Sequence, residues 1–311
     1  MNLRIASGTA TRDLATTVSV ALGAGPVMGE AESFPDGELR PVVSGVRGDD
    51  VYVVQSTGPP VSDHFVELLL LIDACQRAGA GRVTAVVPYF GYARQDRRSR
   101  GGQALGARVT AAAIVTAGAD RLVVIDPHSA AFEAMFAIPV ETLTAVSAIA
   151  DTLFPGVTPE AVVVAPDLGA VKLAERYASL LGLPMVIVRK TRVSGTTVCA
   201  EGLVGDVDGR PAIVVDDMIS TGATIEAAVQ VLLDNGARQD VSVAATHGLF
   251  VGDAVDRLGR LPLGRLVVTD SLGGTQRLGL PVEVTSIAMM LATAIDRLHR
   301  DQSVDELLGG A

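Results

Sequence analysis

The sequence has little of what several functional classes need. Aromatic residues make up 4% of its 311 residues, and tryptophan is absent. The 25 basic residues are outnumbered by 35 acidic ones, and the formal net charge of −10 argues against an extended nucleic-acid surface. No uncharged apolar run reaches about 18 residues, the length that a membrane-spanning helix requires. We therefore expect no nucleic-acid partner and no membrane span.

Cysteine is also scarce, and the common Walker motif for nucleotide binding is absent. The two cysteines, Cys75 and Cys199, form neither a CxxC motif nor an even disulfide framework, which fits a reducing, cytoplasmic location. Cys75 falls in an apolar helical run and is predicted to be a buried thiol. The N-terminal segment lacks the clean apolar stretch of a signal peptide. No GxxxxGK[ST] motif is present, so ATP would have to be held without a Walker loop.

Aliphatic residues and glycine dominate instead, as in parallel sheets covered by helices. Short apolar runs alternate with segments of helical periodicity, and this alternation predicts right-handed βαβ units. Ser62 is a plausible N-cap for the first long helix. The predicted strands are 51–55, 83–87, 122–125, 162–165, 185–188, 213–215 and 241–244, and the predicted helices are 63–78, 103–117, 169–181 and 224–235.

The pattern restarts after Pro155 and indicates an internal duplication. The stretch VVQSTGPP (53–60) and the stretch VVDDMISTGAT (214–224) each follow an apolar run and precede a helix. Both continue into a Gly-Ala turn and another strand. Two unrelated βαβ units would show the same order of elements, so both duplication and independent origin stay open. If the copies are related, only the second kept its two acids.

Asp216 and Asp217 stand side by side at the end of the predicted strand 213–215, where they repel each other. In open α/β sheets, ligands bind beyond the carboxyl ends of the strands. The following loop of small residues leads into a helix N-terminus, which favours an anion such as phosphate. Carboxylates next to a phosphate site would suit the hydroxyls of a phosphorylated sugar. The structural alternative is a solvated turn with a threonine as the helix N-cap.

VVDDMISTGAT resembles the pentose-phosphate motif of ribose-phosphate diphosphokinases, the PRPP synthetases, which phosphoribosyltransferases share. SFPDGELR (33–40), residues 55–98, VVVAPDLGAVKLAERYA (162–178) and RKTRVSGTT (189–197) are similar to further blocks specific to the diphosphokinases. The resemblance covers nearly the whole chain. It implies an α/β fold of two tandem phosphoribosyltransferase-like domains, each a mostly parallel sheet flanked by helices. The expected boundaries are 1–145 for the N-terminal domain, 146–295 for the C-terminal domain and 296–311 for a C-terminal helix or tail.

The resemblance also implies an activity, namely transfer of the diphosphoryl group of Mg-ATP to the 1-hydroxyl of ribose 5-phosphate, which gives PRPP and AMP. It implies Mg²⁺ as cofactor and a cytoplasmic homo-oligomer that is a dimer, tetramer or hexamer. The expected site residues are Lys190, Arg192 and His128 for catalysis; Phe34, Asp36, Glu38, Arg94 and Gln95 for ATP; Asp216, Asp217, Ser220, Thr221, Gly222, Ala223 and Thr224 for ribose 5-phosphate; and His128 and Asp167 for metal.

These residues also have structural readings. Asp36 lies in a Pro-Asp-Gly turn, which is common as a turn alone, and Asp167 could be a helix N-cap. Residues 189–197 resemble the family's mobile catalytic loop, but a Lys-x-Arg loop is often only solvated. The alternatives to the enzyme are a non-catalytic regulatory relative and a phosphoribosyltransferase. The first would be expected to lose loop cations or motif acids, and the second would not need the N-terminal half.

The chain departs from the common family pattern at several positions. Ser220 and Ser99 stand where aspartate is usual, and Pro127 precedes His128 where leucine is usual, so His128 is expected to be presented differently. Gly101 and Gly102 replace a Ser-Arg pair that helps to bind allosteric phosphate or ADP in regulated enzymes. We therefore expect phosphate activation and ADP allostery to be weak or absent.

Overall fold

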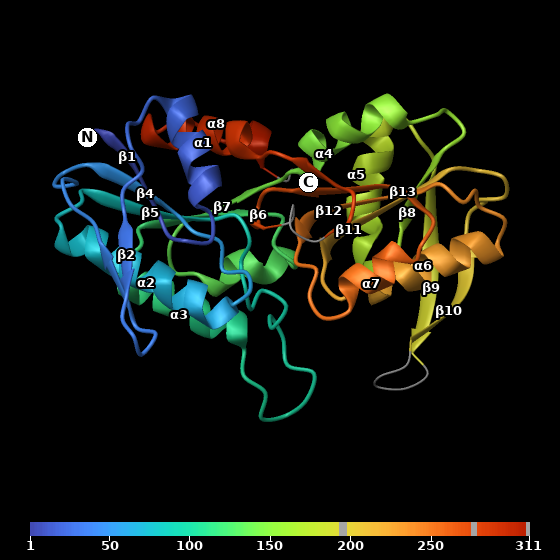
Figure 1. The fold of residues 1–311 in the computed structure, drawn as a ribbon, viewed down its shortest axis with the longest axis horizontal. Coiled ribbons are helices and arrows are strands. Elements are labelled where there is room, and N and C mark those ends of the chain that lie inside the picture. The colour runs from blue at the N-terminus through green and yellow to red at the C-terminus, as the bar shows by residue number, and fades with distance from the viewer. Residues whose placement is uncertain (193–197, 275–278, 309–311) are drawn as a thin grey trace. The chain divides into compact units, whose positions relative to one another are not determined.

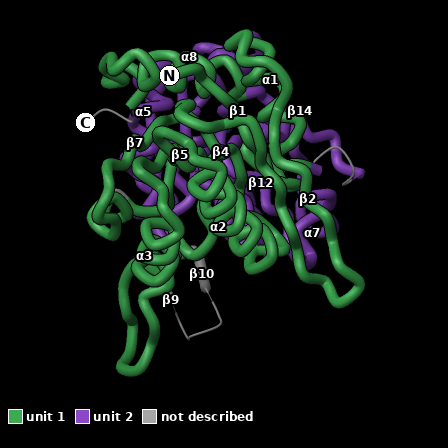
Figure 2. The backbone as a smooth tube through the Cα atoms, turned by 90° about the vertical axis from the view of Figure 1, so that its left-hand side faces the viewer, with its two compact units in different colours: residues 1–144, 271–273, 287–311 green, residues 145–270, 274–286 purple. Residues whose placement is uncertain are grey.

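The computed structural model describes residues 1–192, 198–274 and 279–308, without the side chains of Ala130 and of residues 190–201 (Figure 1). The chain divides into two compact units, which Figure 2 colours separately. Unit 1 consists of residues 1–144, 271–273 and 287–311, and unit 2 of residues 145–270 and 274–286. These units are defined by packing, and the expected domain boundaries at 145 and 295 stay a prediction.

Unit 1 is built on a five-stranded parallel sheet in the order β1-β4-β5-β6-β7. Helices α2 and α3 cover one face of the sheet, and α1 and α8 lie side by side on the other (Figure 1). A separate antiparallel hairpin, β2–β3, projects from this unit. The elements are β1 (Leu3–Ser7), α1 (Arg12–Leu22), β2 (Glu30–Ser33), β3 (Leu39–Val42), β4 (Asp50–Val54), α2 (Val61–Arg77), β5 (Arg82–Val87), α3 (Gly106–Ala117), β6 (Arg121–Ile125), β7 (Val140–Leu143) and α8 (Ala288–His299).

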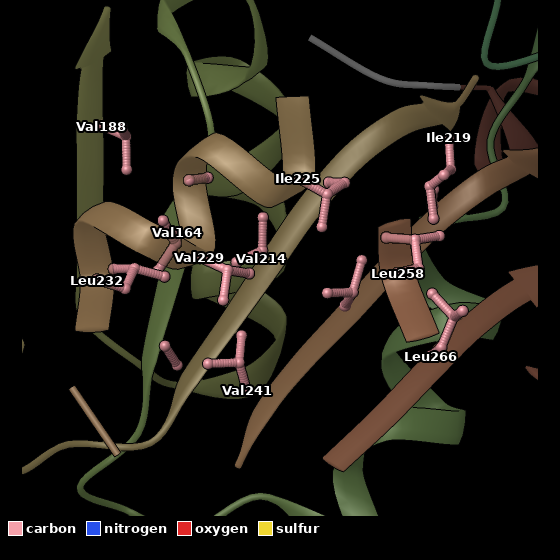
Figure 3. Packing of buried hydrophobic residues seen from close by; sticks show 14 of the residues in the cluster. Val164, Val188, Val214, Ile219, Ile225, Val229, Leu232, Val241, Leu258 and Leu266 are labelled. Atoms are coloured by element: carbon pink, nitrogen blue, oxygen red, sulfur yellow. The ribbon is translucent and has the colours of Figure 1, made fainter. Parts of the chain in front are cut away.

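Unit 2 is built on a seven-stranded sheet in the order β10-β9-β8-β11-β12-β13-β14, in which only the β9–β10 pair is antiparallel. Its core joins the central strands to α6 and α7 through residues such as Val164, Val214 and Leu258 (Figure 3). The elements are α4 (Val146–Leu153), β8 (Val162–Ala165), α5 (Val171–Leu181), β9 (Met185–Arg192), β10 (Val198–Val204), β11 (Ala212–Ile219), α6 (Ala223–Asp234), β12 (Val241–Gly248), α7 (Ala254–Gly259), β13 (Leu263–Thr269) and β14 (Val282–Thr285).

The two sheets repeat one arrangement. Strands β1, β4, β5, β6 and β7 follow the same parallel order as β8, β11, β12, β13 and β14. Between the first and second strand of each set come a helix and then an antiparallel pair, β2–β3 in one case and β9–β10 in the other. The predicted fold class, two tandem parallel-sheet domains flanked by helices, is confirmed, and this topology favours duplication as its origin.

The predicted strands and helices are all present, but several of their ends differ, and three of these differences have a clear physical reason. The helix predicted from residue 63 begins at Val61, directly after Pro60, so Ser62 is not its N-cap but a helical residue whose Oγ lies 3.2 Å from the Tyr92 hydroxyl. The helix predicted from residue 103 begins only at Gly106. Strand β11 continues to Ile219 because β12 pairs with it as far as Gly248. Cys75 is buried as predicted, and burial raises the pKa of its thiol to about 12.

Candidate active site

Asp216 and Asp217 lie at the point in the sheet of unit 2 where the order in which strands are added changes direction. The chain leaves β8 through α5 to reach β9 on one side, and later returns to β11 on the other side of β8. Such a switch point opens a crevice at the carboxyl ends of the two central strands. Asp167 follows β8, and Asp216 and Asp217 lie in the last half of β11, not beyond its end as the sequence suggested. The fold therefore brings three predicted site residues to one place.

The three carboxylates interact electrostatically. Burial raises the pKa of Asp216 well above its ordinary range, and the charges of Asp217 and then Asp167 raise it further. The backbone amide of Asp217 donates to Oδ1 of Asp216 at 3.0 Å, which fixes the pair. Three acids gathered in this way would be relieved by a cation or by a ligand that donates hydrogen bonds.

The donor set suits a hard cation such as Mg²⁺. All three side chains offer carboxylate oxygens, and magnesium usually takes one or two carboxylates together with substrate phosphates and waters. Oδ1 of Asp167 already accepts from the Gly169 amide at 2.9 Å, which is the N-cap contact that its sequence position allowed. Within the described residues, no group of three or more His, Cys, Asp or Glu side chains is arranged so that it could hold a metal ion by itself. An ion here would depend on the substrate for part of its coordination.

The loop after β11 has the form expected of an anion site. Ser220, Thr221 and Gly222 join the strand to α6, and Gly222 forms the helix N-cap with a φ of +75°. The first amides of a helix have no partner within it, and the helix dipole adds positive potential there. The Val251 amide donates to the Ser220 carbonyl at 3.0 Å and anchors the loop to the segment before α7. Ala223 and Thr224 begin the helix itself, one residue earlier than the sequence indicated.

The predicted nucleotide residues in the β2–β3 hairpin form a tight turn. The Phe34 amide donates to the Glu38 carbonyl at 2.8 Å, and Asp36 accepts from the Glu38 amide at 3.1 Å. The Phe34 ring is 40% exposed, with the Arg40 guanidinium 5.0 Å from its centre. Asp36 thus has the structural role that its motif suggested, and the ring is open enough to stack on a base.

A second group of predicted residues lies on the loop after β5. Arg94 and Gln95 are exposed, and the neighbouring Asp96 side chain is only 5% exposed and pairs with Arg97 at 3.0 Å. The hydrogen bond from Arg97 lowers the pKa of Asp96, and a further one from Ser129 lowers it too. Because Ser129 follows His128, Asp96 holds the arginine loop next to the loop of the predicted metal-binding histidine.

The loop of His128 has an unusual backbone. Asp126 adopts a φ of +38°, a value that is rare outside glycine, and its amide donates to the Leu143 carbonyl at 3.0 Å. Pro127 follows directly, and His128 is exposed. The sequence predicted an altered presentation of His128 through Pro127, and a positive φ at Asp126 is consistent with that prediction. Its role as a metal ligand stays a prediction.

Sequence reasoning missed Gln103 and a pair of residues beside the loop that joins β11 to α6. Oε1 of Gln103 accepts from the Ser99 amide and hydroxyl, each at 2.9 Å, and from the Arg100 amide at 3.2 Å. This contact explains why the helix does not start at residue 103. Arg257 pairs with Glu226 next to Gly222. No local signal reveals that pair, because its members are 31 residues apart.

The structure describes the backbone of the predicted catalytic lysine and arginine but not their side chains. Lys190 and Arg192 occupy the end of β9, opposite Ala200 and Val198 of β10. Their side chains and residues 193–197 lie outside the described part of the structure, as does the side chain of Cys199. Their catalytic roles stay predictions.

A parallel sheet with acids and a small-residue loop before a helix at its switch point is typical of the class of α/β proteins that bind anionic ligands beyond the carboxyl ends of their strands. Comparison with known proteins narrows the class. Residues 3–118 match a family model described as the N-terminal domain of ribose phosphate pyrophosphokinase, and residues 197–309 match the phosphoribosyl synthetase-associated domain. This chain belongs to the ribose-phosphate pyrophosphokinase family.

Individual relatives match over nearly their full length. A ribose-phosphate pyrophosphokinase of Rhodopirellula baltica is 42% identical, with 98% of each chain covered. One from Gloeobacter violaceus is 40% identical over 98% of this chain and 92% of the relative. The crystal structure of phosphoribosylpyrophosphate synthetase from Mycobacterium smegmatis has a TM-score of 0.90 and 36% identity, and the match covers 97% of this chain and 100% of that one.

Proposed function

We propose that this protein is a ribose-phosphate diphosphokinase that converts ATP and ribose 5-phosphate into PRPP and AMP. The observation that carries the proposal is the full-length similarity to enzymes of that name, which spans both halves of the chain. The acids and the anion loop at the switch point of unit 2 give the proposal a chemical basis. A phosphoribosyltransferase would leave the matched N-terminal half without a purpose.

Unit 2 would hold ribose 5-phosphate. The 5-phosphate would lie at the loop 220–224, where amides and hydroxyls converge at the N-terminus of α6. Asp216 and Asp217 would accept hydrogen bonds from the ribose hydroxyls. The raised pKa of Asp216 is consistent with this assignment. Burial and neighbouring charges destabilise its ionised form, so hydrogen bonds from ribose hydroxyls would stabilise that form.

Unit 1 would hold the nucleotide. The Phe34 ring would stack on the adenine, with Asp36 and Glu38 as acceptors, and Arg94 and Gln95 would contact the phosphates. Asp167, Asp216 and Asp217 are the residues of unit 2 that would engage Mg²⁺, and the metal role of His128 in unit 1 is a separate part of the proposal. Bound Mg²⁺ would reduce the negative charge of the transferred phosphates.

In the reaction, the 1-hydroxyl oxygen of ribose 5-phosphate forms a bond to the β-phosphorus of ATP. The bond from that phosphorus to the oxygen bridging it to the α-phosphate breaks, the hydroxyl proton is lost, and AMP leaves. Lys190 and Arg192 would stabilise the charge that develops on the transferred group. Such transfer depends mainly on positioning and charge stabilisation.

The test is a product assay with ATP, Mg²⁺ and ribose 5-phosphate, read by mass spectrometry. We expect equimolar AMP and PRPP. The Lys190→Ala variant should lose roughly 100- to 1,000-fold in kcat, the scale of removing one transition-state contact. Lys172, the only other lysine and an exposed residue of α5, provides the matched control, and Lys172→Ala should retain the wild-type rate.

Formation of ADP in place of AMP would refute the proposal. No turnover with intact ribose 5-phosphate binding would instead support the regulatory relative that the sequence left open. Lys190, Arg192, Asp216 and Asp217 are all present in this chain, so we expect turnover. We further propose a cytoplasmic homo-oligomer, as the family resemblance implies. Among the residues that the structure describes, no helix is long and apolar enough to cross a membrane.

A further inference from the structure

The first turn of α6 contains a residue that conflicts with the proposed phosphate site. Glu226 lies in that turn, and its amide makes the helix's first hydrogen bond, to the Gly222 carbonyl at 2.9 Å. A carboxylate near a helix N-terminus interacts favourably with the helix dipole and therefore competes with any other anion there. Left uncompensated, its charge would also repel a phosphate bound at residues 220–224.

Arg257 of α7 compensates this charge. Its Nη1 donates to Oε2 of Glu226, and the two side chains are 27% and 38% exposed. Its aliphatic stem also packs on the loop, because a Cβ placed on Gly222 would lie only 3.4 Å from Cδ of Arg257. The Arg257 side chain thus contacts both the carboxylate and the backbone of the anion loop.

The position of Arg257 is fixed by its surroundings. Leu258, the next residue, is 2% exposed and lies in the core near Ile225 of α6 (Figure 3). The Arg257 amide donates to the Asp253 carbonyl at 2.9 Å. Nε of Arg257 is enclosed and has no acceptor within the described residues. Because Nη1 pairs with Glu226 and Nε is enclosed, Arg257 would act through Glu226 and the loop.

We propose that Arg257 is a positioning residue for the sugar phosphate: it neutralises Glu226 and supports the backbone of loop 220–224. The inference rests on the proposed function, because it concerns the same phosphate site. It means that phosphate binding at this loop requires a positive charge from a residue outside the loop, Arg257. Without Arg257, the Glu226 carboxylate becomes an unpaired anion in the turn that should receive the phosphate.

The test is steady-state kinetics of Arg257→Met in the full-length enzyme. We expect KM for ribose 5-phosphate to rise about tenfold, equivalent to about 1.4 kcal/mol, with kcat and KM for ATP within about twofold of wild type. The double variant Arg257→Met/Glu226→Gln should recover most of this loss, because the repelling charge is gone. A purely structural role of Arg257 predicts no such recovery. Calorimetry with ribose 5-phosphate alone should show the same order of affinities.

Arg265→Met is the matched control, since Arg265 is also 27% exposed and pairs with Glu283 in unit 2 at the amino end of β13. It should leave KM for ribose 5-phosphate unchanged. The inference is overturned if Arg257→Met binds ribose 5-phosphate as tightly as wild type, or if the double variant is no better than the single one. Wild-type turnover decides the proposed function separately, so the two can fail independently.

Discussion

At the scale of single residues, some side chains that the sequence predicts to bind ligands also have a structural role. Asp167 caps the turn after β8 and also raises the pKa of Asp216 through its charge. Asp36 closes a hairpin turn on the strand pair that presents Phe34. The structural roles predicted for Asp167 and Asp36, a helix cap and a turn, are confirmed. They do not exclude ligand binding, because a carboxylate has more acceptor capacity than one hydrogen bond uses.

Gly222 allows the first residue-scale prediction. Its φ of +75° disfavours any side chain, and an added Cβ would also lie 3.3 Å from Leu258. We expect Gly222→Ala to lower the free energy of unfolding by more than about 1 kcal/mol and to weaken ribose 5-phosphate binding. The measurements are urea denaturation and calorimetry.

Gly182→Ala separates the two causes in this prediction. Gly182 has a φ of +67° at the end of α5, but nothing lies within 4 Å of an added Cβ. It should show the backbone cost alone and bind ribose 5-phosphate normally. Equal effects of the two substitutions on binding would contradict the view that Gly222 packing shapes the anion loop.

At the scale of elements, strands were easier to predict than their ends. The apolar run 213–215 identified the core of β11. The sequence did not predict that the strand continues through Asp216 and Asp217, because this extension depends on pairing with β12. The helix start at Val61 follows from Pro60, and the start at Gly106 from the side chain of Gln103. Ends depend on such specific partners, whereas periodicity reports only the middle of an element.

The end of α8 is held by a buried carboxylate. Asp50 at the start of β4 has a fully buried side chain and accepts from Arg82 at 2.6 Å, with Nδ1 of His299 2.7 Å away. Burial raises the pKa of Asp50, but the hydrogen bonds and charges of Arg82 and His299 together outweigh burial and leave the pKa below its ordinary 3.8. The ionised form is therefore stabilised by folding.

This ion pair predicts a pH-dependent stability. Because folding lowers the pKa of Asp50, its contribution is complete above pH 3.8 and is lost as pH falls through the lower folded value. Asp50→Asn should cost about 3–5 kcal/mol at pH 7, and its difference from wild type should shrink below roughly pH 4. Urea denaturation across the pH range measures both.

Asp73→Asn is the control for Asp50, because Asp73 forms only an exposed i,i+4 pair with Arg77 in the same unit. It should change stability by less than about 1 kcal/mol. A difference between Asp50→Asn and wild type that stayed constant into the acid range would argue against an ionised Asp50 as the source of the stabilisation.

At the scale of the whole molecule, the two halves exchange a helix. The helix after the last strand of each half packs on the sheet of the other: α4 joins unit 2 beside α5, and α8 joins unit 1 beside α1 (Figure 1). Ile149 of α4 and Ile295 of α8 are both fully buried. The last helix of the chain is thus part of the first unit, so neither sheet is fully covered by its own half.

This exchange predicts crossed effects of core substitutions. Ile295→Ala should destabilise unit 1 and Ile149→Ala unit 2, each by about 2–5 kcal/mol. Amide hydrogen exchange should show faster exchange within 1–144 for Ile295→Ala and within 145–270 for Ile149→Ala. Met289→Ala, at a 67% exposed position of α8, should show neither effect. Loss of protection within 145–270 for Ile295→Ala, or within 1–144 for Ile149→Ala, would contradict the exchange.

The sequence by itself determined the chemistry of the site and the repeating βαβ pattern. Motifs such as DDMISTGAT and the periodicity of apolar residues are local, so they can be recognised along the chain without a fold. Only the tertiary structure decided which distant groups meet: Asp167 with Asp216, Arg257 with Glu226, and Asp50 with His299, 249 residues away. These contacts arise from strand order and helix exchange, and no local pattern encodes the pairing of segments that lie far apart in the chain.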